Sequence, residues 1–300
     1  MKKFSAIALL ITISSGMLFA HPAFAHTFVQ NPDADMIAKI QEFKVETRLI
    51  ADNISNNTLA QWHVSKSQGY WGSNEMGILN TKDPTLAGKI SATVGSLYSL
   101  AGQQSPDQSQ ANQTASNLGA LMDQAESELV PDTSRGNATV QALAMVGVLN
   151  EVLTDYGSAI GSSVDLTNMD NMNMSSGNSM QGMSGMSMPA TPIVNMAAYQ
   201  SAKGLGETVQ GMFSNIQSTS PSSALPYLGK TGSAISELNQ KIASQASGND
   251  VMTVVHMKIH PNLISAFSIE AVPEFPTPII LTMAGFAGLI AMTRFYHRNP

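Results

Sequence analysis

The chain has 300 residues, a formal net charge of −6 at pH 7 and no cysteine. Without thiols it forms no disulfide and no thiolate metal site, so any metal ligand must be histidine, methionine, carboxylate or the terminal amine. The acidic balance and the lack of a dense basic patch argue against a nucleic-acid partner. No nucleophile elbow, zinc-protease helix, P-loop or dinucleotide-binding motif occurs, so we do not expect an enzyme.

The first residues have the pattern of a secretory signal peptide. Lys2 and Lys3 give a positive start, residues 4–13 are mostly apolar, and the tripeptide AFA at 23–25 is an A-x-A cleavage site. We therefore assign residues 1–25 to a signal peptide and expect the mature protein to work outside the cytoplasm.

Cleavage after residue 25 would make His26 the first residue of the mature chain. An N-terminal histidine can bind one metal ion through its amine and its ring Nδ1. A second imidazole would complete the planar nitrogen arrangement that Cu(II) prefers. This arrangement resembles the histidine brace of copper monooxygenases and of some periplasmic copper carriers. The alternative is that His26 is only the residue that the peptidase happens to leave first.

Apolar residues recur every three or four positions through the body of the chain, which is typical of amphipathic helices. No alternating run is long enough to build a sheet, so we predict an all-α helical bundle. Pro32, Asp83 and Pro226 mark helix starts. The four apolar stripes are Met36, Ile40, Phe43, Thr47 and Ile50; Leu86, Ile90, Val94 and Leu97; Leu143, Val146, Leu149, Leu153, Tyr156 and Ile160; and Leu228, Ile235, Leu238 and Ile242.

The composition divides this body into three parts. Residues 26–163 are predicted to form a helical unit of about four or five helices. Within it, residues 103–125 are polar and are expected to be a loop followed by an exposed helix. Residues 164–192, rich in Ser, Asn, Gly and Met, are expected to be a disordered linker. Residues 193–268 add about two or three helices that complete the same bundle, since so few helices have a thin core alone.

The linker carries seven methionines among polar residues, with no Leu, Ile or Val between positions 168 and 190. A thioether is a soft ligand that selects Cu(I), and it binds without losing a proton. In composition the segment resembles the Met-rich segments of periplasmic copper-resistance and copper-transport proteins, which implies Cu(I) capture or transfer. The alternative is a hinge without a metal. The candidate ligands are Met169, Met172, Met174, Met180, Met183, Met186 and Met188.

Two further candidate ligands, His256 and His260, are four residues apart in a helix expected to start near Asp250. That spacing puts both rings on one helix face, and Met252 on the same stripe could add a sulfur. Pro261 disfavours helical geometry at His260. The alternative is a strand, which would also put both rings on one side but further apart.

The remaining candidate ligand is His63, on a short helix predicted after Asn57. Trp62, Tyr70 and Trp71 surround it in the sequence. Aromatic neighbours would give a metal ligand a dry environment, but an ordinary hydrogen-bonded core histidine has the same surroundings. Both interpretations remain open at this point.

The last part of the chain, residues 269–300, has three successive features. The motif VPEFP at 272–276 precedes an apolar run at 279–292, and Arg294 and Arg298 follow. This order resembles the PEF-type sorting signals of archaeal surface proteins processed by archaeosortases, particularly those of ammonia-oxidising archaea. The resemblance implies removal of the helix and anchoring of the new end. The alternative is an ordinary membrane anchor with its basic end inside.

These features together predict a copper-binding protein held at the outer face of the membrane. The Met-rich segment would capture or transfer Cu(I), the histidines would hold Cu(II), and a copper donor or acceptor protein would be a partner. The alternative is a structural or interaction protein of the cell envelope without a metal. A copper oxidase built on His26 would also need a substrate cleft, of which the sequence gives no sign.

Overall fold

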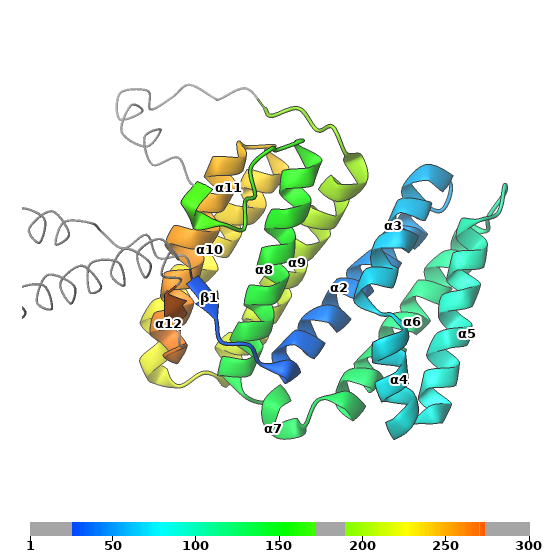
Figure 1. The fold of residues 1–300 in the computed structure, drawn as a ribbon, viewed down its shortest axis with the longest axis horizontal. Coiled ribbons are helices and arrows are strands. Elements are labelled where there is room, and N and C mark those ends of the chain that lie inside the picture. The colour runs from blue at the N-terminus through cyan, green and yellow to red at the C-terminus, as the bar shows by residue number, and fades with distance from the viewer. Residues whose placement is uncertain (1–25, 172–189, 270, 274–300) are drawn as a thin grey trace, which may run out of the picture. The chain divides into compact units, whose positions relative to one another are not determined.

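The computed structural model describes residues 26–171, 190–269 and 271–273. Residues Phe28–Ala271 form one compact unit, and this unit is almost entirely helical. The all-α prediction is therefore confirmed (Figure 1). The two strands in the described ranges, β1 (His26–Phe28) and β2 (Ala271–Pro273), have three residues each and pair with one another.

The described helices fall into two stretches of the chain. Those before the Met-rich segment are α2 (Pro32–Asp52), α3 (Asn57–Tyr70), α4 (Ser73–Lys82), α5 (Pro84–Ala101), α6 (Gln108–Leu129), α7 (Asp132–Arg135), α8 (Ala138–Ala159) and the 3-10 turn η1 (Met169–Asn171). Those after it are α9 (Met196–Thr219), the 3-10 turn η3 (Ser222–Ala224), α10 (Leu225–Ala243), α11 (Gly248–Val254), the π-helical η4 (Val255–Ile259) and α12 (His260–Phe267).

Helix α2 is the central element of the bundle. It packs against α3 and α6 on one side and against α8 and α9 on the other, so it lies between the α3–α6 group and the α8–α12 group (Figure 1). Its predicted stripe faces inward, since Ile40, Phe43, Thr47 and Ile50 are all buried. Helix α8 packs along α9, and its own stripe forms the middle of the core.

Local capping sets two of the three predicted helix starts, those at Pro32 and Asp83. The Asn31 side chain accepts hydrogen bonds from the backbone N–H groups of Asp33 and Ala34, both at 3.0 Å, ahead of Pro32. Asp83 caps α5 in the same way, accepting from Leu86 N–H at 2.9 Å. A side-chain oxygen at the N-cap satisfies backbone donors that have no partner within the helix. These starts were therefore readable from a few adjacent residues.

The prediction was wrong about the helix count and about the exposure of one helix. Residues 26–163 contain seven α-helical segments rather than about four or five, because short turns at 71–72 and 83 divide the run after α3 and because α7 is a single turn. Helix α6 follows the predicted loop but is not simply exposed. Its small and long apolar residues, among them Ala111, Leu118 and Met122, are fully buried against α2 and α5.

Helix α8 ends in a left-handed turn at Gly161, whose φ is +64°. The Ser162 N–H returns to the Gly157 carbonyl at 2.9 Å, which satisfies a carbonyl at the helix end. After the Met-rich segment, Thr191 N–H bonds to the Gln245 carbonyl and Val194 N–H to the Ala159 carbonyl, each at 2.8 Å. The chain therefore leaves and re-enters the bundle close to the same end of α8.

The predicted signal peptide at 1–25 lies outside the described residues, and so does the apolar run at 279–292. No helix within the described ranges combines the length and the apolar character that crossing a bilayer requires.

Substitution Leu149→Ala should destabilise the bundle by about 2–5 kcal/mol, because a fully buried leucine leaves a cavity that the surrounding helices fill only in part. Denaturant unfolding of the purified protein measures this loss. The neighbouring Asn150 is exposed, so Asn150→Ala is the matched control and should change stability by less than about 0.5 kcal/mol. Equal effects from both substitutions would contradict the assigned core.

Candidate functional site

His256 and His260 lie on a continuous helical stretch that contains one π-helical turn. The prediction of a strand as an alternative was wrong, and so was the expectation that Pro261 would keep His260 from helical geometry. His260 has φ −55° and ψ −48°, and its N–H bonds to the Val255 carbonyl five residues earlier. The wider π turn accommodates the proline, because its ring would clash with a carbonyl in a regular helix and it has no N–H to donate.

The two imidazole rings are neighbours in the protein interior. Their centroids are 5.3 Å apart with an interplanar angle of 80°, and the residues are 4% and 2% exposed. The Phe28 ring packs edge-on against His260 at 5.0 Å. Two imidazoles that share a metal ion, with metal–nitrogen bonds of about 2 Å, have centroids roughly 4–6 Å apart. The pair therefore has a spacing compatible with one shared ion.

A backbone hydrogen bond orients the first of these rings. His256 Nε2 lies 3.0 Å from the Leu166 carbonyl oxygen. Because a carbonyl can only accept, Nε2 carries the proton, and in the neutral ring Nδ1 carries the lone pair. Histidine ligands of metals commonly have one ring nitrogen fixed in this way by a backbone carbonyl. Leu166 is three residues before Met169, so the bond ties the pair to the start of the Met-rich segment.

Met252 is the remaining predicted contributor to this pair. It is 2% exposed and lies four residues before His256, in the helical turn ahead of the π turn. In the part of the chain that the structure describes, no group of three or more His, Asp or Glu side chains could hold a metal ion. The Met252 thioether as a third ligand of the pair stays a prediction.

Most of the other predicted ligands lie outside the described residues. Met169 is in the 3-10 turn η1 and is partly buried. Met172, Met174, Met180, Met183, Met186 and Met188 fall in the range 172–189, which the structure does not describe. His26 begins strand β1, and its side chain is not among those described. The roles of these residues in metal binding stay predictions.

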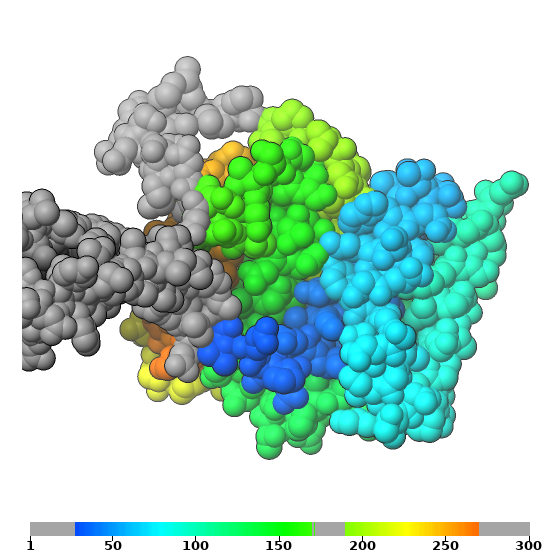
Figure 2. All heavy atoms as spheres, in the orientation of Figure 1, coloured from blue at the N-terminus to red at the C-terminus, as the bar shows by residue number. Residues whose placement is uncertain are grey.

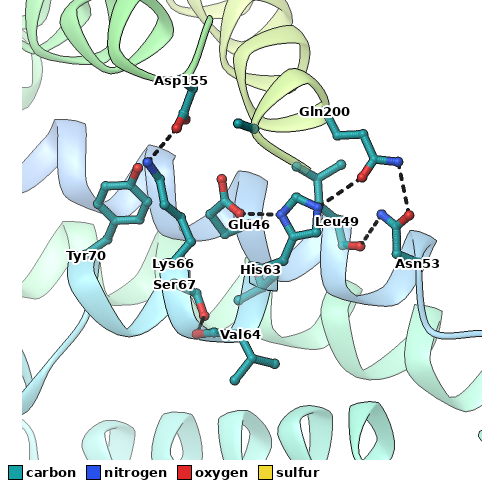
Figure 3. Close-up of polar contacts among 12 residues, drawn as sticks. Glu46, Leu49, Asn53, His63, Val64, Lys66, Ser67, Tyr70, Asp155 and Gln200 are labelled. Carbon is teal, nitrogen blue, oxygen red and sulfur yellow. Dashed lines mark hydrogen bonds and ion pairs between the residues drawn. The ribbon is translucent and has the colours of Figure 1, made fainter. Parts of the chain in front are cut away.

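His63 lies in a different place, within a hydrogen-bonded chain that joins α2, α3 and α9 (Figure 3). Its Nδ1 is 2.7 Å from Glu46 Oε2, and its Nε2 is 3.1 Å from Gln200 Oε1. Gln200 Nε2 then donates to Asn53 Oδ1 at 3.0 Å, and Asn53 Nδ2 donates to the Leu49 carbonyl at 2.9 Å. The His63 and Glu46 side chains are both 0% exposed.

The order of donors and acceptors in these hydrogen bonds decides which ring nitrogen of His63 carries a proton. The Leu49 carbonyl can only accept, so Asn53 and Gln200 each donate through their NH₂ groups and accept through their oxygens. His63 Nε2 must therefore carry a proton. Both ring nitrogens are engaged, and His63 has different neighbours from His256 and His260. This geometry matches the hydrogen-bonded core histidine rather than a metal ligand, and we do not include His63 in the candidate metal site.

The sequence analysis missed a set of four carboxylates near His63, three of them buried and Glu151 partly exposed. Glu42 and Glu46 come from α2, and Glu151 and Asp155 come from α8. Lys66 Nζ bonds to Glu151 Oε1 and Asp155 Oδ1, both at 2.6 Å. A usable signal was present, since each helix has two acidic residues four apart within a mostly apolar stretch.

Burial changes the protonation of these groups. It raises the pKa of Glu42 to about 8, with a further rise from the nearby Glu151 charge. It raises the pKa of Asp155 to about 7 despite the opposing effect of Lys66. Burial also disfavours the charged form of Lys66, but the carboxylates of Asp155 and Glu151 outweigh this and raise its pKa. Tyr70, which donates to Glu151 Oε1 at 2.8 Å, has a raised pKa, first because it is buried and then because of the Glu151 charge.

Comparison with known proteins adds no assignment, because no family model, curated protein or solved structure matches this chain.

Substitution His63→Ala should cost about 3–5 kcal/mol, because it leaves the buried Glu46 carboxylate without its partner. Chemical denaturation at pH 7 measures the loss. The double variant Glu46→Ala/His63→Ala should recover part of it, since the uncompensated charge is then gone. Ser65→Ala, exposed on the same helix, is the matched control. A cost below about 1 kcal/mol for His63→Ala would show that the contact contributes little.

Proposed function

We propose that this chain is an extracytoplasmic copper-binding protein. The observation that carries the proposal is the buried His256–His260 pair, with its rings 5.3 Å apart and His256 hydrogen-bonded to the backbone of Leu166 just ahead of the Met-rich segment. In this proposal the histidines hold Cu(II), and the Met-rich segment captures Cu(I) or transfers it.

The donor chemistry favours copper over other cations. Imidazole is a good ligand for copper, and thioethers select Cu(I). Hard cations such as Mg²⁺ and Ca²⁺ require several oxygen ligands, and among the described residues no carboxylate joins the histidine pair in a metal-binding group. The chain has no cysteine, which excludes the thiolates that structural zinc sites commonly use.

The location and the partners belong to the same proposal. The signal-like residues 1–25 support export, and the motif and apolar run at 272–292 support attachment at the outer face of the membrane. A protein that exchanges copper there would need a copper donor or acceptor as its partner. We assign no catalytic reaction to the chain.

Replacing all seven methionines between 169 and 188 with leucine should abolish tight Cu(I) binding, because leucine keeps the apolar bulk and removes the sulfur. The measurement is a Cu(I) competition titration of the purified full-length protein. Met196 and Met257 are exposed methionines outside this segment, 49% and 46% exposed, so Met196→Leu/Met257→Leu is the matched control and should keep wild-type affinity. Unchanged affinity in the seven-site variant would overturn the Cu(I) part of the proposal.

His256→Asn and His260→Asn should each remove one imidazole nitrogen ligand from bound Cu(II). Electron paramagnetic resonance of the full-length protein with one equivalent of Cu(II) should show a nitrogen hyperfine pattern that changes in both variants. Lys258→Ala is the control, because Lys258 is exposed on the same π turn between the two histidines. Spectra that match the wild type in both histidine variants would contradict Cu(II) binding by the pair.

One observation favours the second candidate, a structural or interaction protein. Met257 lines a shallow groove with Pro226 and Gly229, and the large apolar residues Leu225 and Tyr227 are 48% and 38% exposed at the start of the same helix α10. Leu225 and Tyr227 flank Pro226 of this groove in the sequence, and contiguous exposed apolar surface is typical of binding surfaces for other proteins. Failure of both copper experiments would leave this function as the better explanation.

A further inference from the structure

The carboxylates around Lys66, three of them buried and Glu151 partly exposed, have more negative charge than the neighbouring cations can balance. We call Glu42, Glu46, Glu151 and Asp155 the acid cluster. Their ionised forms would bring four negative charges into the interior between α2 and α8. The basic groups hydrogen-bonded to the cluster are His63 and Lys66, both from α3. Even with both ring nitrogens of His63 protonated, full ionisation would leave two negative charges without a counter-charge.

The burial of these groups makes that excess costly. Glu42 is 7% exposed, and the side chains of Glu46 and Asp155 are 0% and 2% exposed. Two carboxylate oxygens, Glu46 Oε1 and Asp155 Oδ2, are buried without a hydrogen-bond partner. A buried carboxylate that lacks a counter-charge takes up a proton rather than remaining charged.

Lys66 and Tyr70 both bond to the acid cluster from α3. Lys66 bonds across from α3 to α8, and its side chain is 21% exposed. Its Nζ lies 5.7 Å from the Trp62 ring centroid and 5.6 Å from that of Tyr70. On the face drawn in Figure 2, the surface of α3 (light blue) adjoins that of α8 (green). The Glu151 side chain is 23% exposed, so this edge of the cluster reaches solvent.

A metal ion does not explain the cluster. The described residues offer no group of three or more carboxylates and histidines with the geometry of a metal site. The Lys66 ammonium already makes the two 2.6 Å contacts that a cation would make. The charge that balances the remaining carboxylates must therefore be a proton.

We propose that the acid cluster is a proton-binding site that keeps α2 and α8 closely packed while it holds protons. When the protons leave, the carboxylates of α2 repel those of α8, and water enters between the helices from the edge where Glu151 lies. The inference does not depend on copper, because the cluster shares no residue with the His256–His260 pair.

Among the described residues, the groups that act most strongly on Glu42 and Asp155 come from α2, α3 and α8, and they include the Tyr70 hydroxyl. Glu42 faces Glu151, Asp155 and Lys66. The charge of Lys39, on the same helix as Glu42, has a smaller effect on the Glu42 pKa. Asp155 faces Lys66, Glu151 and Glu46. Two residues of α9 adjoin this region: Gln200, which is hydrogen-bonded to His63, and the buried Ser201. Both are neutral.

The sign of the pH effect follows from the direction of these shifts. Glu42 and Asp155 have ordinary pKa values of 4.5 and 3.8, which rise to about 8 and about 7 in the folded protein. The folded state therefore binds more protons than the unfolded state between about pH 4 and 8, and stability falls as pH rises through this range. The loss is complete only above about pH 8.

The first test is the pH dependence of unfolding for the full-length protein and Glu42→Gln. The unfolding equilibrium constant of the wild type should increase at least about tenfold between pH 5.5 and 8.5, since one pKa unit corresponds to a factor of ten. Glutamine imitates protonated glutamate, so the variant should show a smaller increase and be the more stable protein at pH 8.5. Glu207→Gln, with a side chain 55% exposed, is the matched control and should keep the wild-type slope.

The second test locates the opening by hydrogen exchange at pH 8.5. Amides of α3 and the middle of α8 should exchange faster in the wild type than in Glu42→Gln, whereas amides of α10 should not differ. Asp155→Asn provides a second variant if Glu42→Gln does not fold. An identical pH slope in wild type and both variants, or faster exchange throughout the bundle, would overturn the proposal.

Discussion

Burial of helix α2 is the constraint on which the rest of this structure depends. The helix has neighbours on both sides, α3 and α6 on one and α8 and α9 on the other, and it brings Glu42 and Glu46 into the interior with its apolar residues. A carboxylate in such a place needs a counter-charge or a proton. The hydrogen-bond partner of Glu46 is therefore His63, from a helix that covers α2. The contact of His63 with Gln200 extends these polar contacts from α2 and α3 to α9.

The histidines of the described interior show how similar residues acquire different chemistry. His63 belongs to a series of hydrogen bonds that ends at a backbone carbonyl, and its Nε2 proton is donated to Gln200. His256 has one nitrogen oriented by a carbonyl and a second histidine ring at 5.3 Å. The arrangement at His63 suits a structural ion pair, whereas the arrangement at His256 suits a metal ion shared by two histidines. Burial alone does not separate them, since all three rings are almost fully buried.

The proposed copper site and the acid cluster use different parts of the bundle. The histidine pair belongs to the helical stretch after α10, close to where the Met-rich segment begins, whereas the acid cluster lies where α2, α3 and α8 meet. Copper binding and proton binding can therefore be measured separately. Because α8 contacts both α2 and the α11–α12 region, opening at the acid cluster would involve a helix that also supports the histidine pair.

The sequence alone determined the helical class, the four apolar stripes and the helix starts at Pro32 and Asp83, because periodicity and helix-start signals involve residues within a few positions of each other. The Met-rich segment was also readable, since composition needs no partner. Tertiary structure alone decided the π turn that admits Pro261, the pairing of His63 with Gln200 and the closure of Lys66 onto Asp155. The last two join residues 137 and 89 positions apart. Such contacts depend on how whole helices pack, and no local pattern specifies that.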